Sequence, residues 1–224
     1  MNIVRLVPTR RTPPARSRRR YDSTRRREQA RRTRLDILDA AGQLFVERGY
    51  AGTKLSAVAE AAGVAVDTVY AAYGSKPGLL RALVTAALRG SEDAEPLRES
   101  ATIQAIRAEP DARRKLTLYG GLLAEVNPRL APLARVLREA APSEPVIAEM
   151  WAGLQDDRLD GMREFAAHLG DSGALRDGVS KAQARDVLWA LGSPELHDLL
   201  VSARGWSVKR YGAWVAEQMI AALL

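Results

Sequence analysis

The residues with the clearest chemical meaning in this 224-residue chain are thirteen arginines crowded into its first 34 positions. Only Asp22 and Glu28 oppose them, so residues 1–34 carry a formal charge of +11. Residues 35–90 are neutral and residues 91–224 carry −4, which gives +7 for the whole chain. Such an asymmetry favours a polyanionic partner, usually nucleic acid and sometimes a membrane surface.

The sequence offers few residues for metal binding, cofactor binding or catalysis. The chain has no cysteine, which excludes a disulfide framework and a thiolate metal site, and neither His168 nor His197 has a second imidazole four residues away. We therefore predict no metal and no cofactor. Neither a nucleotide-binding glycine loop nor a Ser/His/Asp spacing stands out, so an enzyme is not expected. No apolar run is long enough to predict a membrane span, and a chain without cysteine suits the reducing cytoplasm.

The arginine-rich segment itself is predicted to be disordered. Residues 1–30 contain Pro8, Pro13 and Pro14 and have almost no apolar content after Val7, so they cannot form a packed core. The functional interpretation is an electrostatic arm that lies along DNA phosphates. A flexible solubilising tail, an over-long assigned start and an organellar transit peptide are the alternatives.

The following segment predicts a compact group of helices. The abundance of Ala, Leu, Arg and Glu favours an all-α fold, and an apolar stripe at helical spacing ends at Gly49. Thr53 stands at an N-cap position, and the short helix after it ends at Gly63. A second short helix is expected over residues 65–73, and a longer one begins at the N-cap Ser75. Two short helices joined at a glycine indicate a helix-turn-helix, although an ordinary helical hairpin has the same spacing.

Residues 37–84 contain a distinctive set of residues, namely Ala40, Ala41, Leu44, Phe45, Gly49, Tyr50, Thr53, Ala59, Ala62, Gly63, Val64, Thr68, Tyr70, Tyr73, Lys76, Leu79 and Leu80. With this set, the segment resembles the DNA-binding domain of the TetR/AcrR family of bacterial transcriptional regulators. The match covers about a quarter of the chain. It implies an all-α fold with a three-helix helix-turn-helix DNA-binding domain over residues 31–90. A helical-bundle domain for effector binding and dimerisation then occupies residues 91–224.

The resemblance also implies roles for individual residues. Thr68 and Tyr70 match hydroxyls that often contact phosphates, and Lys76 matches a phosphate-clamping lysine at a helix N-terminus. Thr53 matches a residue that caps the preceding helix and often touches the DNA backbone. The predicted DNA-binding residues are Thr53, Ala65, Val66, Asp67, Thr68, Tyr70, Tyr73 and Lys76, together with Arg31 and Arg32 from the arm.

The sequence departs from the family pattern at four positions. Ala65 stands where a capping Ser is usual, which costs roughly 1 kcal/mol unless Asp67 compensates from the first helical turn. Asp67 replaces a common Gly, Ala72 replaces a frequent His, and Tyr73 replaces Phe. The recognition helix thus carries no Arg or Lys. Base reading is left to residues 65–67 and Ala71, through methyl contacts to thymine and an Asp67 carboxylate that accepts from a cytosine amino group. Arginines of the arm add contacts in the minor groove.

Residues 91–224 have no such resemblance at the level of motifs and are interpreted from their helix signals. Serines, prolines and glycines mark the boundaries of six or seven helices. Two apolar stripes could line a ligand cavity, and Arg158 interrupts one of them, either as an anchor for an anionic ligand or as a salt-bridged residue with a packed stem. The mid-helix pair Gly120 and Gly121 leaves room for a ligand or lets two helices approach. The expected helices are 97–108, 111–126, 128–140, 143–169, 181–191, 194–203 and 207–223, and the candidate pocket residues are Tyr119, Leu123, Trp151, Leu154, Arg158 and Phe165.

The last two expected helices are unusually apolar, which favours a partner surface. In the family that the chain resembles, these helices pair with their symmetry mates in a four-helix dimer interface, whereas the alternative is that they close the monomer core. The candidate interface residues are Leu188, Trp189, Tyr211, Trp214 and Met219.

Together these features predict a dimeric, sequence-specific regulator, a repressor that a small-molecule effector releases from a pseudo-palindromic operator in double-stranded DNA. Two other interpretations stay open. One is a non-specific DNA-binding protein driven by the arm, and the other is a helical ligand-binding or catalytic bundle that has lost DNA binding.

Overall fold

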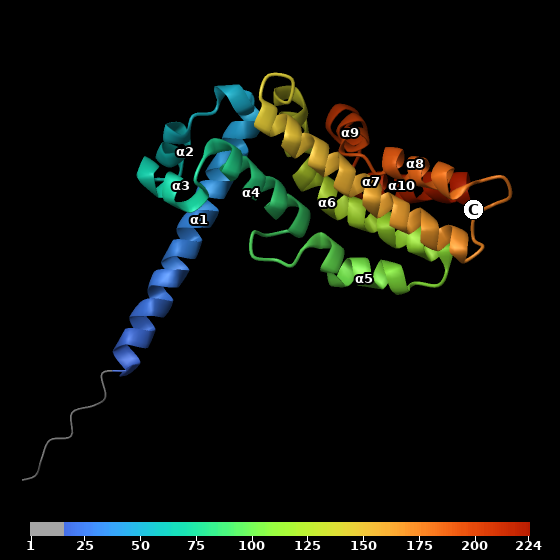
Figure 1. The fold of residues 1–224 in the computed structure, drawn as a ribbon, viewed down its shortest axis with the longest axis horizontal. Coiled ribbons are helices and arrows are strands. Elements are labelled where there is room, and N and C mark those ends of the chain that lie inside the picture. Colours follow the sequence, from blue (N-terminus) through green and yellow to red (C-terminus); the bar gives the residue numbers. More distant parts are fainter. Residues whose placement is uncertain (1–15) are drawn as a thin grey trace, which may run out of the picture.

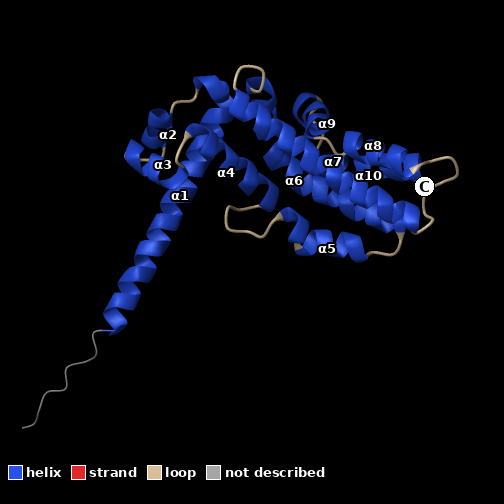
Figure 2. Ribbon diagram, viewed as in Figure 1, coloured by secondary structure: helices blue, strands red, loops and turns tan. Residues whose placement is uncertain are grey.

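A computed structural model describes residues 16–224, with side chains described from residue 25 onward. These residues form helices and no β-strand, so the predicted all-α class is confirmed (Figures 1 and 2). The helices are α1 (Arg16–Gly52), α2 (Leu55–Ala61), α3 (Val66–Tyr73), α4 (Lys76–Arg89), η1 (Leu97–Glu99), α5 (Ala101–Ala108), α6 (Ala112–Ala140), α7 (Pro145–Asp171), α8 (Lys181–Leu191), α9 (Pro194–His197), the π-helix η2 (Asp198–Ala203) and α10 (Val208–Leu223).

The beginning of α1 corrects the predicted arm. Residues 16–30 lie in this helix, so the expectation of disorder is wrong for them, while residues 1–15 lie outside the described residues. The last proline before the helix is Pro14, and Arg, Gln, Glu and Ala are good helix formers. Because the packed second half of α1 supplies the nucleus, each further residue adds a helical hydrogen bond at little cost. Helix α1 consequently projects well beyond the rest of the molecule (Figure 1).

The predicted boundaries around α2 to α4 are largely confirmed. Regular helical backbone in α1 is interrupted at Gly49, whose φ of 69° lies in the left-handed region that favours glycine. Ser75 caps α4, because its side chain accepts a hydrogen bond from the backbone N–H of Gly78 at 3.1 Å. Pro77 lies in the first turn of that helix, where it removes no hydrogen bond.

Helix α6 differs from the prediction. It runs unbroken from Ala112 to Ala140 through Pro128 and Pro132, where two helices were expected. Asn127 does not act as a cap, because its side-chain amide donates to the hydroxyl of Tyr211 at 2.8 Å in the core. A proline inside a helix costs about 3 kcal/mol. Here the burial of many α6 residues before and after the two prolines offsets that cost.

Helices α6 and α10 approach each other closely at a pair of glycines. A Cβ atom on Gly120 would lie 2.5 Å from the carbonyl oxygen of Gly212, and one on Gly212 would lie 2.7 Å from the carbonyl oxygen of Gly120. A Cβ atom on Gly121 would meet nothing within 4 Å. Of the two sequence-based explanations for the glycine pair, close helix approach therefore holds for Gly120.

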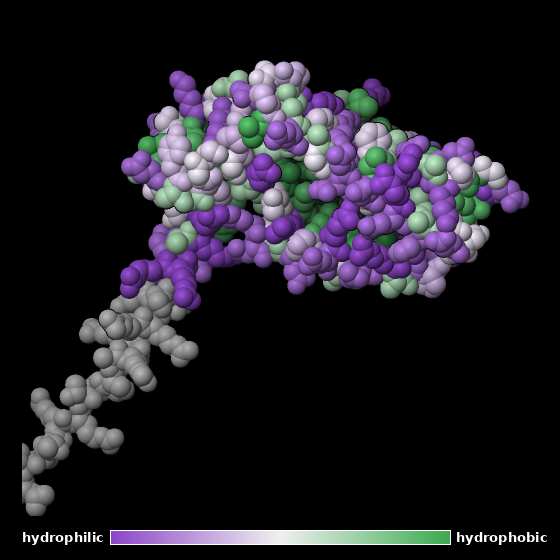
Figure 3. Space-filling model, viewed as in Figure 1, coloured by the Kyte–Doolittle hydropathy of each residue, from purple (hydrophilic) through white to green (hydrophobic). Residues whose placement is uncertain are grey.

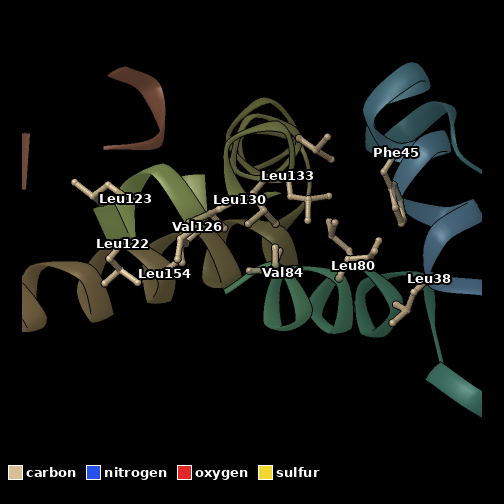
Figure 4. Packing of buried hydrophobic residues seen from close by; sticks show 14 of the residues in the cluster. Leu38, Phe45, Leu80, Val84, Leu122, Leu123, Val126, Leu130, Leu133 and Leu154 are labelled. Atoms are coloured by element: carbon tan, nitrogen blue, oxygen red, sulfur yellow. The ribbon is translucent and has the colours of Figure 1, made fainter. Parts of the chain in front are cut away.

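One hydrophobic cluster joins the two halves of the molecule. Helix α4 contributes Leu80 and Val84, which lie between Leu38 and Phe45 of α1 on one side and Leu130 of α6 on the other (Figure 4). Because buried side chains are closely packed, a shift of α4 must be felt both by the first three helices and by α6.

Candidate nucleic-acid interface

Helices α2 and α3 form the predicted helix-turn-helix. Their axes are bent by 108° at the turn, where Gly63 has a φ of 66°. Val58 of α2 and Val69 of α3 are fully buried, and Val64 in the turn packs against them. This small core fixes α3 relative to α1 and α2, so the orientation of its outer face is set by packing and not by solvent-exposed contacts.

The outer face of α3 is open to solvent. Ala65, Val66, Asp67, Tyr70 and Ala71 are exposed, and the Tyr70 side chain keeps 49% of its surface accessible. Val66 is also 37% exposed, so two large hydrophobic side chains of α3 are open to solvent. The structure thus brings the four predicted base-reading residues and one predicted phosphate contact to a single face.

The start of α3 lacks a side-chain cap, as its sequence indicates. Ala65 occupies the N-cap position without a capping hydrogen bond, and Asp67 is the acidic residue of the first turn. Thr68, the other predicted phosphate contact, is half-buried beside this end, and its backbone N–H bonds the carbonyl of Ala65 at 2.9 Å. The first backbone N–H groups of a helix have no intrahelical partner, so an anion is favoured at this end of α3.

Thr53 has a different position from the predicted one. It is 1% exposed, and its hydroxyl lies 2.8 Å from the carbonyl oxygen of Gly49 and 3.0 Å from that of Leu44. The N-cap of α2 is Lys54, which makes no side-chain capping bond. Because the left-handed Gly49 frees carbonyls at the end of α1, Thr53 satisfies them there and has no hydroxyl turned toward solvent.

Lys76 lies at the first position of α4 and is half-buried. Its ammonium nitrogen sits 4.2 Å from the centre of the Tyr50 ring, a cation–π contact. Burial lowers the pKa of Lys76, and nearby Glu144 opposes that shift. The contact holds the charge at the N-terminus of α4, where an anion from outside could meet it.

Tyr73 ends α3 and is tied inward instead of presenting its hydroxyl. The hydroxyl donates to the backbone carbonyl of Arg34 at 3.0 Å, and burial strongly raises the pKa of Tyr73. Arg34 lies over the Tyr73 ring at 4.5 Å, donates to the carbonyl of Ala72 at 2.9 Å and pairs with Glu92. This junction binds the end of α3 to α1 and to the segment after α4.

Sequence reasoning missed Arg34 and Glu92 as partners of Tyr73. The one signal for them was the replacement of Phe by Tyr at position 73, since a buried hydroxyl needs an acceptor. Arg34 and Glu92 are 58 residues apart in the sequence, and no motif indicates that they are in contact.

The two named arm residues lie on α1 and are exposed. The Nε of Arg31 donates to Asp93 at 2.9 Å, and this hydrogen bond raises the pKa of Arg31. Arg32 and Arg25 to Arg27 are also exposed along the same helix. In the space-filling view, strongly hydrophilic residues cover the described part of α1 beside the helix-turn-helix (Figure 3).

The predicted ligand-pocket residues are only partly gathered. A cavity of about 90 Å³ lies between α5, α6 and α7, and Tyr119 and Phe165 line it, with their rings in edge-to-face contact at 5.1 Å. Leu123, Trp151, Leu154 and Arg158 are not among its lining residues. No local pattern marked the lining residues on α5 and η1, because those elements are brought over α6 and α7 only by the tertiary fold.

Arg158 is hydrogen-bonded by neutral groups, which differs from the salt bridge expected in one of the two sequence-based explanations. Its guanidinium donates to the side-chain oxygen of Gln155 at 2.7 Å and to the carbonyl of Trp189 at 2.9 Å. It also lies 5.3 Å from the centre of the Trp189 ring, and burial lowers its pKa. The interruption of the apolar stripe is explained by this attachment of α7 to α8.

Three of the five predicted dimer residues belong to the monomer core. Leu188, Tyr211 and Met219 are fully buried within the single chain, so their assignment to an interface was wrong. They close the core because α8 and α10 turn their most apolar faces inward. Trp189 and Trp214 stay half-exposed, and Trp214 meets Trp206 edge to face at 5.7 Å.

Two features of residues 16–224 bear on other functions. No group of three or more metal-ligating side chains comes together there. Within the same residues, no single helix is long and apolar enough to cross a membrane, and only the bent pair α2 and α3 passes by length and composition.

Comparison with known proteins agrees with this geometry. Residues 37–83 match the family model of the bacterial regulatory proteins of the tetR family. This segment of the chain, which contains the helix-turn-helix, is similar to the DNA-binding domain of that family. Members of this family are regulatory proteins, and the curated relatives that match are transcriptional regulators.

Individual relatives resemble the chain to different extents. It is 40% identical over 60 residues to the HTH-type transcriptional regulator TtgR of Pseudomonas putida, which covers 27% of this chain and 29% of TtgR. The chain therefore matches less than a third of the length of this curated relative. Solved structures match much more of the chain.

The structure of SmeT in complex with triclosan is 25% identical to this chain, with a TM-score of 0.63, and covers 86% of this chain and 91% of SmeT. The structure of NalD, the secondary repressor of the MexAB-OprM multidrug efflux pump in Pseudomonas aeruginosa, is 21% identical, with a TM-score of 0.65. That comparison covers 88% of this chain and 98% of NalD, and it concerns the fold.

Proposed function

We propose that this chain is a homodimeric, sequence-specific repressor of the TetR family that binds a pseudo-palindromic operator in the cytoplasm and is released by a small molecule. The observation that carries the proposal is the open face of α3, on which Val66, Asp67 and Tyr70 are exposed on a helix fixed by buried valines. An exposed, rigid second helix of a helix-turn-helix is suited to enter the major groove.

The groups proposed to contact bases and most of those proposed to contact phosphates lie on different helices. Helix α3 carries no cation, so it offers methyl groups and the Asp67 carboxylate to base edges. The arginines of α1, with Lys76 and the hydroxyls of Thr68 and Tyr70, supply the contacts to phosphates, which fix register but carry no sequence information. The domain division supported by this arrangement places DNA binding in residues 31–90 and the effector and dimer functions in residues 91–224.

A two-fold dimer would place two α3 helices about one turn of DNA apart, near 35 Å. The outer faces of α8 and α10 are the proposed interface, with the half-exposed Trp189 and Trp214 as anchors. Aromatic side chains that keep part of their surface exposed are typical of such interfaces.

Release by an effector requires a ligand that favours the arrangement unable to bind DNA, by about 1–3 kcal/mol for ordinary coupling. The α4 residues Leu80 and Val84, packed against both halves of the molecule, provide a physical route for that coupling (Figure 4). The relative SmeT was solved with triclosan and NalD is named a repressor, which supports both parts of the proposal.

A direct test removes the exposed ring on α3. We expect Tyr70→Ala to weaken binding to a selected operator by about tenfold or more, because the variant loses both a phosphate contact and the buried area of the ring. Leu199→Ala is the matched control, since Leu199 is 61% exposed but lies on η2 in the other domain. Equal operator affinity of the Tyr70 variant and the control would contradict the proposal, and it would favour a bundle that has lost DNA binding.

The second candidate, non-specific binding driven by the arm, is favoured by one observation, the exposed arginines along α1. Replacing Arg25, Arg26 and Arg27 by Gln distinguishes the two. Each phosphate that is no longer neutralised lowers the slope of log affinity against log salt by about 0.9. If the arm alone drives binding, this variant loses affinity for the operator and for random DNA by the same factor. The repressor proposal expects the preference for the operator to survive.

A further inference from the structure

The cavity between α5, α6 and α7 has an apolar interior. Its walls are formed by the side chains of Ile103, Ile106, Tyr119, Met162 and Phe165, and its volume is about 90 Å³. The Tyr119 hydroxyl is used internally, because it donates to the sulfur of Met162 at 3.2 Å. The interior therefore suits the apolar body of a ligand and offers it no free polar partner.

Cationic side chains outnumber carboxylates around this cavity. Arg98 and Arg107 both pair with Glu164, each at 3.1 Å, so two guanidinium groups share one carboxylate. Lys115 also lines the cavity, and it is only 9% exposed. Three cations thus face one anion on the cavity wall.

Lys115 is the most unusual of these groups. Its ammonium carries three donors, and the hydrogen bond described for it goes to the backbone carbonyl of Arg107 at 3.3 Å. Burying a charge is costly unless the charge is paired and well hydrogen-bonded. A carboxylate from outside would give this ammonium a charge-assisted bond, which is about twice as strong as a neutral one.

Helix α5 covers the cavity and is weakly attached. Ile106 is its only fully buried residue, and Ile103 is half-buried. Its ion pair from Arg107 to Glu164, and that of Arg98 from the preceding η1, join this segment to α7, but the Glu164 side chain is 50% exposed. Exposed ion pairs contribute about 0–1 kcal/mol, so an incoming carboxylate can compete with Glu164 for the two arginines.

We infer that this cavity binds a small organic carboxylate, with the carboxylate between Lys115, Arg98 and Arg107 and a short apolar body against Tyr119 and Phe165. The inference rests on the proposed function, in which a small molecule acts as effector, and it names the chemical class of that molecule. A cavity of about 150 Å³ holds benzene, so 90 Å³ takes the first few carbons of an alkyl chain, and the weakly attached α5 shifts outward to admit a chain as long as that of hexanoate.

The test is a binding titration followed by NMR without DNA, with hexanoate and 1-hexanol as matched probes at about 0.15 M salt. We expect hexanoate to bind the full chain about tenfold more tightly than 1-hexanol. Lys115→Met, which keeps the packed stem and removes the charge, is expected to abolish that preference while 1-hexanol binding is unchanged. Lys209→Met is the control, because it removes an exposed lysine on α10.

Glu164→Gln gives a result that a merely structural role for these residues would not produce. Removing the competing carboxylate should tighten hexanoate binding several-fold and leave 1-hexanol unaffected. Equal affinities for the two probes, binding of neither, or an unchanged preference in Lys115→Met would overturn the inference. Because DNA is absent, these results are independent of operator binding, which is measured separately and tests only the proposed function.

Discussion

The outer face of α3 and the cavity beneath α5 are built in opposite ways. The face comes from consecutive residues of one short helix, held by buried neighbours such as Val58 and Val69 within the same fifty-residue segment. The cavity draws Arg98, Lys115 and Glu164 from η1, α6 and α7. A surface for a long regular polymer can thus be encoded locally, whereas a pocket for a small molecule depends on elements that are distant in sequence and meet only in the folded chain.

The largest expected effect comes from the core that both regions share. Leu80 is fully buried between them, so Leu80→Ala should destabilise the whole chain by about 2–5 kcal/mol. We expect one cooperative urea transition that shifts for probes in both halves, because one packed cluster joins them. Val146→Ala, at a 47% exposed position, serves as the control. Two separate transitions, with only the first four helices affected, would break the link between the regions.

A smaller effect separates two adjacent glycines on α6. Gly120→Ala should destabilise the chain by about 1–3 kcal/mol, because its Cβ would overlap the carbonyl oxygen of Gly212. Gly121→Ala should stabilise it by up to about 1 kcal/mol, since the helix gains propensity and the Cβ meets nothing within 4 Å. Thermal unfolding checks this, because the melting temperature should fall in Gly120→Ala and rise in Gly121→Ala. Equal changes in the two variants would contradict the close approach of α6 and α10.

A pH dependence is expected from the domain that contains the cavity. His197 is 4% exposed, both ring nitrogens lack a hydrogen-bond partner, and burial lowers its pKa below the usual value of 6.5. The unfolded chain therefore binds a proton more readily than the folded chain. Stability from this residue is fully present above pH 6.5 and is lost as the pH falls below it. Between about pH 7.5 and pH 5, the urea midpoint of His197→Phe should fall less steeply than that of the unchanged chain. An equal fall in the two proteins would contradict a neutral, buried His197 ring.

The smallest expected effect concerns the start of α3. Ala65→Ser supplies the missing N-cap, so we expect a stabilisation of about 0.5–1 kcal/mol in thermal unfolding. Lys54→Ser, at the uncapped start of α2, is a matched variant for the neighbouring helix. A destabilised Ala65→Ser would indicate that the first turn of α3 is arranged differently from its local sequence signals.

The parts of the fold that sequence could predict are those with short-range causes. The break at Gly49, the cap at Ser75 and the exposed face of α3 all follow from residues within a few positions of one another. Thr53 was misplaced because the carbonyls that it satisfies are freed only by the left-handed Gly49.

Long-range packing decided the remaining elements. Residues 16–30 are helical because α1 is nucleated further along the chain, and α6 passes through Pro128 because Asn127 is drawn inward to Tyr211. Apolar residues on α8 and α10 could serve either a core or a partner, and only the fold assigns Leu188 and Met219 to the core. The cations of the cavity carried no periodic signal, since each lies on a different element.

The central claim is that α3 reads DNA sequence in a two-fold dimer. Its most direct test is the selection of bound duplexes from a random pool by the full chain at about 0.15 M salt. We expect an enriched pseudo-palindrome with half-sites about one helical turn apart, and loss of that enrichment in Tyr70→Ala. Recovery of unenriched DNA by the full chain would contradict the claim and leave only the charge of α1 to explain binding.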